Sequence, residues 1–316
     1  MKRLPKLTYA ALALAASMTI GLMSIHSANA KTATTPAAAT SAQISGVTVF
    51  LLGANNNTLY VLAPGSNTAR RIGPIGPVSG TVLEGDFRTA TNQLYIVTNT
   101  GRFYTLNTSN AQATLVSPLS PSNPTSQMLD INPMQDAFRY IGTNDLNYAI
   151  TKGTNGVFNT VAVQTTVAYV QGDVNAGKNP NIVGGAYDNN QNGLATTTFY
   201  YVDSATNQVG TIAQRNANGS SNTGGGQLQT VGALFDQNGR VNITANAGFD
   251  IATFPRLGNL NVGYLVTDSK LTTIFTVQIP RSLPVGSIQN LGGFSQPLVG
   301  SDGNRQWSDV FVPIQQ

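Results

Sequence analysis

Residues 86–106, DFRTATNQLYIVTNTGRFYTL, contain two short segments in which apolar and polar side chains alternate. The segments are Gln93–Val97 and Arg102–Leu106, and the turn sequence Asn99-Thr-Gly101 lies between them. Alternation with a period of two is typical of a β-strand, and a glycine in the connecting turn tolerates the positive φ that a tight hairpin requires. This part of the chain therefore predicts two antiparallel strands joined by a hairpin.

The same pattern recurs from Gly46 to the end of the chain. No segment there shows the period of an amphipathic helix over three turns. Other strand-like segments are Val47–Leu52, Thr58–Leu62, Ala113–Ser117, Thr198–Val202, Leu228–Val231, Val262–Val266 and Thr273–Val277. We therefore expect a single all-β domain over residues 46–316.

The predicted strands form repeating sets of four, each spanning about 40–60 residues, which is the period of a β-propeller blade. An Asp recurs beside an aromatic residue or Ile in these sets, at Asp86-Phe87, Asp130-Ile131, Tyr187-Asp188 and Phe249-Asp250. The first set holds three strands, at 47–52, 58–63 and 68–75, and the C-terminal segment Trp307–Val312 is left over. Pairing of that last strand with the first set would close a ring. The sequence predicts a β-propeller of five blades, each with four antiparallel strands, closed by the C-terminal strand. The alternatives are six blades, if 133–171 is divided, or a β-sandwich.

The first thirty residues have the features of a signal peptide. Lys2, Arg3 and Lys6 precede an apolar stretch, and Ala28-Asn29-Ala30 matches a small-residue cleavage site. An uncleaved membrane anchor is the alternative interpretation. Residues 31–45 are low in complexity and predict a flexible leader. We expect a protein that is secreted, periplasmic or extracellular, with no membrane insertion after signal cleavage.

The composition after residue 30 removes several kinds of catalytic site. The chain has no cysteine, its one histidine is His26, and Glu84 is its one glutamate. It therefore lacks the usual general base and the thiolate nucleophile. Three of the seventeen basic residues lie in the first thirty positions, so the remaining charge is close to neutral and predicts no nucleic-acid partner. We expect no enzymatic activity and no catalytic residue.

The recurring Asp residues allow two interpretations. Inner strands of a propeller line the central channel, where several carboxylates could converge in a catalytic ring. The simpler interpretation is that each Asp accepts hydrogen bonds from backbone N–H groups at the end of a strand. Glu84 and Asp86 lie two residues apart on one face of a strand. Because Arg88 shares that face, a structural ion pair is simpler than a pair of glycosidase carboxylates.

The segment Gly172–Asn181 resembles a calcium-binding loop. Asp173, Asn175 and Asn179 supply side-chain oxygens, and Gly177 can present its carbonyl. The segment lacks the bidentate Glu of an EF-hand and carries one carboxylate. Asx-turns that support a long loop are the alternative. Calcium is the one metal that the sequence suggests, and no other cofactor is expected.

Several motifs together resemble the bacterial domain-of-unknown-function family 4394. Those motifs are Asp86–Tyr95, Gly101–Asn107, Ala113–Val116, Asp130–Pro133, Phe138-Arg-Tyr140, Gly172–Asn181, Ala186-Tyr187 and Gly248–Ile251. The segment Gly-Asp-x-Asn-Ala-Gly-x-Asn-Pro is the most specific of them. The resemblance implies an exported, repeat-built β domain with no assigned activity, so it transfers no catalytic residue.

The function we expect is that of a non-enzymatic binding or cell-surface-associated module, because loops on a rigid propeller suit recognition. Its ligand would be a protein or a glycan. One alternative is a metal-assisted hydrolase, a lactonase or glycan-acting enzyme, that uses channel Asp and Asn residues. It would require at least three such side chains to converge within coordination distance. The other alternative is a self-associating structural component of the cell envelope.

Overall fold

The structure is a computed structural model that describes residues 46–54, 57–119, 126–142, 144–275 and 284–315. These residues belong to one compact unit, and they form β-strands, turns and two 3₁₀ turns, η1 (Thr223–Gly225) and η2 (Pro255–Leu257). None of the helical segments in these ranges is long or apolar enough to cross a bilayer. The predicted signal peptide and leader lie outside the described residues.

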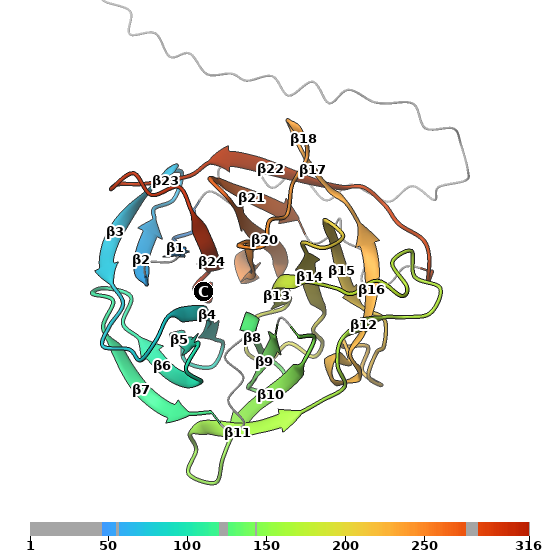
Figure 1. The fold of residues 1–316 in the computed structure, drawn as a ribbon, viewed down its shortest axis with the longest axis horizontal. Helices are drawn as coiled ribbons and strands as arrows, with labels where there is room; N and C mark the ends of the chain where they lie inside the picture. The colour runs from blue at the N-terminus through green and yellow to red at the C-terminus, as the bar shows by residue number, and fades with distance from the viewer. Residues whose placement is uncertain (1–45, 55–56, 120–125, 143, 276–283, 316) are drawn as a thin grey trace, which may run out of the picture. The chain divides into compact units, whose positions relative to one another are not determined.

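Five sheets, each built on four antiparallel strands, are arranged in a ring (Figure 1), and the central axis that their inner strands surround is called the channel below. From the channel outward, blade 1 consists of β24 (Trp307–Phe311), β1 (Val49–Gly53), β2 (Thr58–Leu62) and β3 (Thr68–Pro74). Blade 2 consists of β4 (Val82–Arg88), β5 (Gln93–Thr98), β6 (Arg102–Leu106) and β7 (Ala113–Pro118). Blade 3 consists of β8 (Ser126–Asn132), β9 (Ala137–Gly142), β10 (Asn147–Lys152) and β11 (Phe158–Val163). Blade 4 consists of β13 (Ile182–Tyr187), β14 (Phe199–Asp203), β15 (Gln208–Ile212) and β16 (Gln227–Gly232). Blade 5 consists of β19 (Gly248–Phe254), β20 (Leu260–Thr267), β21 (Lys270–Phe275) and β22 (Leu291–Pro297).

The period-two alternation lets each blade contribute to two hydrophobic cores. In β5, Leu94 and Ile96 pack into the core between blades 1 and 2. The residues between and after them, Tyr95 and Val97, pack into the core between blades 2 and 3. Successive side chains of a strand point to opposite faces of the sheet, so a blade buried on both faces needs apolar residues at both sets of positions.

The ring closes through the C-terminal strand, as predicted. Strand β24 pairs antiparallel with β1 and places Asp309 opposite Leu52. The inner strands then follow one another around the channel in the order β24, β4, β8, β13, β19 and back to β24. The prediction of five blades is confirmed, and the alternatives of six blades and a β-sandwich are wrong.

The region 133–171, whose division would give a sixth blade, contains one short strand beyond the four of blade 3. That strand, β12 (Ala168–Tyr169), covers the outer edge of the next blade. It follows blade 3 and pairs parallel with β16 at the outer edge of blade 4. Connectors after blades 4 and 5 do the same: β17 (Leu234–Asp236) pairs with β22 and also carries β18 (Gly239–Arg240), while β23 (Val299–Gly300) pairs with β3. After blade 1, Gly76 forms a parallel bridge with Gln112 beside β7. An outer strand with unpaired backbone groups invites aggregation, and these connectors reduce that exposure.

Candidate functional site

Four of the five inner strands carry an Asp that faces the next blade. Asp309 Oδ2 accepts from Gly85 N at 3.1 Å, and Asp86 Oδ2 accepts from Ile131 N at 2.7 Å. Around the same ring, Asp130 Oδ1 accepts from Tyr187 N at 3.1 Å and Asp250 Oδ2 accepts from Val312 N at 2.6 Å. The other oxygen of Asp86, Asp250 and Asp309 accepts the N–H of the residue that follows in its own strand, at 2.6, 2.6 and 2.8 Å. These carboxylates therefore fasten neighbouring inner strands to one another.

The ring of Asp residues is interrupted at blade 4. Tyr187 N donates to Asp130 as Ile131 N donates to Asp86, so Ala186, which precedes Tyr187, occupies the position that Asp holds in the other blades. Grouping Tyr187-Asp188 with the channel Asp residues was wrong, because Asp188 follows the end of β13 and accepts from Thr198 N at 2.5 Å within blade 4. Asp309 was not among the recurring Asp residues expected from the sequence, although Asp309-Val310 repeats the pattern of an Asp before an apolar residue.

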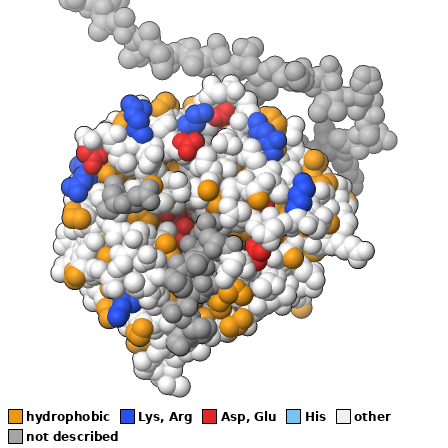
Figure 2. All heavy atoms as spheres, viewed as in Figure 1, with side chains coloured by type: hydrophobic (Ala, Val, Ile, Leu, Met, Phe, Trp, Pro, Cys, Tyr) orange, Lys and Arg blue, Asp and Glu red, His pale blue; other side chains and the backbone are white. Residues whose placement is uncertain are grey.

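The carboxylates of Asp86, Asp130 and Asp250 converge in the channel. One oxygen of each lies within 4.8 Å of one oxygen of the other two, and all three residues are buried. No Lys or Arg forms an ion pair with them among the residues that the structure describes. Figure 2 shows a few acidic atoms near the middle of the face in view, while other acidic side chains and the basic side chains lie nearer its rim.

The expected ion pair of Arg88 with Glu84 and Asp86 is not formed. Arg88 Nε and one terminal nitrogen instead donate to the two oxygens of Asp136, at 2.7 and 2.6 Å. Asp136 lies in the β9 hairpin of the next blade, so the partner is remote in the sequence. Glu84 is buried beside Asp309, and neither acid forms an ion pair with a Lys or Arg of the described ranges.

Burial and mutual repulsion raise the pKa values of this acidic cluster. Burial, followed by the charge of Asp250, raises the pKa of Asp86 well above its ordinary value. Burial, with the charges of Asp86 and Asp250, has the same effect on the pKa of Asp130. Burial raises the pKa of Asp250 to about 8 and that of Asp309 to about 7. The pKa of Glu84 is raised by burial and then by Asp309, and its carboxyl hydrogen-bonds to Asp309.

The loop between β13 and β14 connects blade 4 to blades 2 and 5. Asn190, in the segment between β13 and β14, donates its backbone N–H to Thr253 Oγ1 of blade 5 at 2.7 Å. Its Oδ1 accepts from the hydroxyl of Thr89, which follows β4 in blade 2. The neighbouring Asn189 exchanges hydrogen bonds of 3.0 Å with Asn261 of blade 5. Because Asn190 and Thr89 are both buried, three blades are joined across the channel at this level.

The predicted calcium loop lies away from the channel, between β12 and β13. Asp173 accepts from Thr230 N and Asn175 N at 2.8 and 2.9 Å and from the Thr230 hydroxyl at 2.7 Å, and Lys178 Nζ donates to Asn175 Oδ1 at 2.9 Å. Gly177 and Asn179 are exposed. The loop thus uses its buried oxygens to attach to β16, and calcium binding there stays a prediction.

The channel offers a different set of oxygen ligands. Carboxylate oxygens are what calcium and magnesium prefer, and Asp86, Asp130 and Asp250 present three of them at one place. Each of these side chains also accepts at least one backbone N–H. A cation held here would therefore share its ligands with the hydrogen bonds that fasten the blades.

The sequence model of "Domain of unknown function (DUF4394)" matches residues 58–300, which includes every channel Asp except Asp309. The chain belongs to the DUF4394 family. The resemblance inferred from the motifs is thereby confirmed. A search among curated proteins found no match for this DUF4394 chain.

Solved structures similar to this DUF4394 propeller include two that differ strongly in sequence. One, from Bacteroides uniformis, is described as a "putative 6-phosphogluconolactonase"; it is 10% identical with a TM-score of 0.36, over 82% of this chain and 70% of that one. The other is the Dos1 propeller, which is 13% identical with a TM-score of 0.39, over 80% of this chain and 62% of that one.

Proposed function

We propose that this DUF4394 protein is a non-catalytic binding module. The observation that carries the proposal is how the channel acids are used. Asp86, Asp250 and Asp309 each accept two backbone N–H groups, one from their own strand and one from the next blade. A general acid or base must reach a reacting group, whereas these carboxylates are oriented by the framework that they hold together. Recognition is then the role of loops and edges on the rigid ring.

The positions of the pockets support recognition outside the channel. One pocket lies at the end of blade 2, and another lies at the outer edge of blade 4, where it is lined by Tyr169, Gln171 and their neighbours. Neither is lined by a charged side chain. Uncharged linings favour uncharged ligands, because a charged ligand would lose hydration there without gaining an opposite charge.

The binding module is proposed to work outside the cytoplasm, in the periplasm or in the extracellular space. The support is the signal-peptide pattern of residues 1–30, with cleavage after Ala30. Expression of the full chain in a bacterial host, followed by fractionation and N-terminal sequencing, tests this. We expect an exported product that begins at Lys31. A product that retains Met1 in the membrane fraction would overturn the proposal.

Binding without turnover is the central test. The purified protein is incubated with a panel of lactones and glycosides, with calcium chloride or with EDTA, and products are quantified against buffer. A glycan array and capture on immobilised candidate proteins report binding in parallel. We expect binding and no product above buffer. Product formation that Asp86→Asn abolishes would show that the channel is catalytic.

A metal-assisted hydrolase is the second candidate, because three channel carboxylates converge within 4.8 Å. Calorimetric titration with calcium chloride distinguishes the two calcium hypotheses when Asp86→Asn and Asp173→Asn are compared with the unaltered chain. Loss of binding in Asp86→Asn alone places calcium in the channel, and loss in Asp173→Asn alone places it in the loop. The hydrolase candidate requires the first result together with turnover, and it is excluded if turnover is missing.

A further inference from the structure

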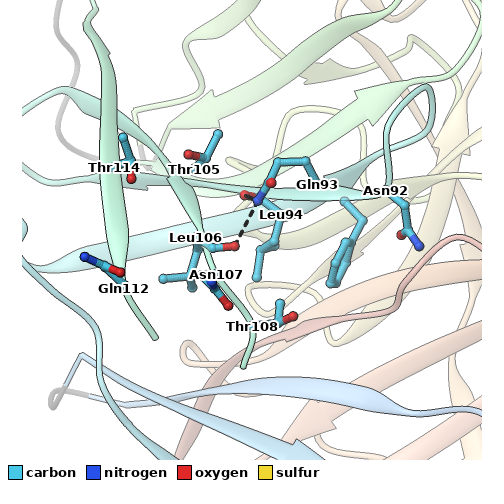
Figure 3. A pocket seen from close by; sticks show the side chains of 10 residues that line it. Asn92, Gln93, Leu94, Thr105, Leu106, Asn107, Thr108, Gln112 and Thr114 are labelled. Atoms are coloured by element: carbon cyan, nitrogen blue, oxygen red, sulfur yellow. Dashed lines mark hydrogen bonds between the residues drawn. The ribbon is translucent and has the colours of Figure 1, made fainter. Parts of the chain in front are cut away.

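A pocket of about 430 Å³ opens at one end of blade 2 (Figure 3). It lies where β4 and β6 end and β5 and β7 begin, so all four strands of the blade border it. Its lining residues are Phe87, Asn92, Gln93, Leu94, Thr105, Leu106, Asn107, Thr108, Gln112 and Thr114. The volume falls within the range of roughly 300–1,000 Å³ that is usual for small-ligand sites.

Seven of the ten lining residues carry a hydroxyl or an amide group. The side chains of Thr105, Thr108, Gln112 and Thr114 form no hydrogen bond with other described residues, so their polar groups are available to a ligand. A hydroxyl can donate and accept at once, and a primary amide offers a donor next to an acceptor. Such a surface complements a ligand whose polar groups both donate and accept hydrogen bonds.

Internal hydrogen bonds hold the pocket in shape. Gln93 Nε2 donates to the carbonyl of Leu106 on the neighbouring strand at 2.9 Å (Figure 3). It also donates to the carbonyl of Leu94 at 3.1 Å. Asn107 Oδ1 accepts from Ser109 N at 2.9 Å, which orders the turn after β6. Just before β5, Asn92 Oδ1 accepts a hydrogen bond from Ile314 N at 2.9 Å. These bonds occupy one end of each amide and leave Gln93 Oε1 and the amide nitrogens of Asn92 and Asn107 for a ligand.

We propose that this pocket binds a neutral saccharide. Sugar hydroxyls both donate and accept, so they complement Thr105, Thr108, Gln112 and Thr114 without any charge. Phe87 and Leu94 lie beneath the pocket, 3% and 0% exposed, so hydroxyl and amide groups form the surface that a ligand would meet. The inference rests on the proposed binding function and names the class of ligand. It would assign the pocket at blade 2, and not the channel, as the place of recognition.

The test uses the full chain on a glycan array of neutral, sialylated and sulfated saccharides. The tightest neutral ligand is then titrated by calorimetry into the unaltered chain and into a double variant, Gln112→Leu with Thr114→Val. These changes preserve approximate shape and remove polar groups that have no structural partner. We expect the double variant to bind at least tenfold more weakly. Thr154→Val, in the exposed turn between β10 and β11 and outside both pockets, is the matched control, and we expect its dissociation constant to stay within twofold.

The outcomes separate the two proposals. Binding of a neutral glycan, without turnover and unaffected by the double variant, would overturn the blade 2 site and leave the proposed function standing. Binding limited to charged saccharides, or to no saccharide, would also overturn the inference. Turnover of a bound glycan that depends on Asp86 would overturn the proposed function. An unchanged thermal unfolding curve of the double variant ensures that lost binding is not lost folding.

Discussion

At the scale of single residues, the channel Asp side chains carry two opposing effects. Each forms hydrogen bonds with backbone N–H groups, and bonds to an ionised acceptor are stronger than bonds between neutral groups. The same side chains lie buried beside one another, so full ionisation would place several negative charges at one site with little water. Backbone hydrogen bonds lower their pKa values, but burial raises them by more.

The first prediction concerns the pH dependence of stability in EDTA. Because the folded state raises the pKa of Asp250 to about 8 and of Asp309 to about 7, it binds protons more tightly than the unfolded chain. The contribution of these groups is fully present below the ordinary carboxyl pKa of about 4 and is lost as the pH rises through 7 and 8. We expect the free energy of unfolding, measured with urea, to fall between pH 5.5 and 8.5.

Removal of the Glu84 carboxyl should reduce the rate at which the free energy of unfolding falls with rising pH. Glu84→Gln keeps the size of the side chain and removes one group that must lose a proton, which is worth up to about 1.4 kcal/mol per pH unit. Asp268→Asn removes one carboxylate from an exposed turn, and it serves as the control that should leave the pH dependence of the free energy of unfolding unchanged. Equal slopes in Glu84→Gln and in the unaltered chain would show that Glu84 carries no extra proton in the fold.

A second prediction at this scale concerns the approach of β19 to β24. A Cβ added at Gly248 would lie 2.4 Å from Asp309 Cα and 2.7 Å from its Oδ1. Gly248→Ala must therefore push two inner strands apart, and we expect a loss of stability of about 1–3 kcal/mol or more. Gly73→Ala is the control, because a Cβ there meets no atom within 4 Å. Similar urea midpoints for both variants would contradict the close packing of these strands.

At the scale of elements, connections between strands do more than link them. The connectors β12, β17 and β23 each add a short parallel strand to the outer edge of the following blade. The loop between β13 and β14 replaces the missing Asp at Ala186, since Asn189 and Asn190 bind blade 5 in its place. A blade without a channel Asp is therefore fastened from a loop.

The third prediction tests this loop. Asn190→Ala removes the acceptor for the buried Thr89 hydroxyl, and an unpaired buried polar group costs about 1–3 kcal/mol. Asn192→Ala, in the same loop, changes an exposed side chain for which the described residues show no partner, and it should change stability by less than about 0.5 kcal/mol. Chemical denaturation of both variants measures the difference. Equal losses would mean that Asn190 does not join the blades.

At the scale of the whole molecule, the chain ends where its ring begins. Strand β24 supplies the inner strand of blade 1, and Asp309 on it links blade 1 to Gly85 of blade 2. Asp250 of blade 5 in turn binds Val312 N just after β24. The last strand therefore joins three blades and leaves no unpaired inner edge at β1.

The fourth prediction follows from this closure. Deletion of residues 307–316 removes β24, exposes the edge of β1 and takes away Asp309. We expect a product that aggregates or unfolds without a cooperative transition, measured by size-exclusion chromatography and thermal denaturation. Deletion of residues 314–316 keeps β24 and is the control. A soluble, cooperatively folding product of the longer deletion would contradict closure by the last strand.

Local patterns in the sequence were sufficient for the strands, the turns and the blade count. Positive φ at Gly101 agrees with the turn expected from Asn99-Thr-Gly101. The spare segment Trp307–Val312 correctly indicated closure. The recurrence of Asp near each inner strand was visible, as was its capacity to bind backbone N–H groups.

The relations between blades were decided by the tertiary structure. Nothing near Tyr187-Asp188 shows that Ala186 faces the channel, because that depends on the register of β13 against β8. Arg88 was assigned to acids of its own strand, yet its partner Asp136 comes from the next blade. Alternation and turn chemistry act between neighbours in the chain, so the sequence alone determines strands and their order. Which carboxylates meet in the channel depends on contacts between residues far apart in the chain, and only the closed ring establishes them.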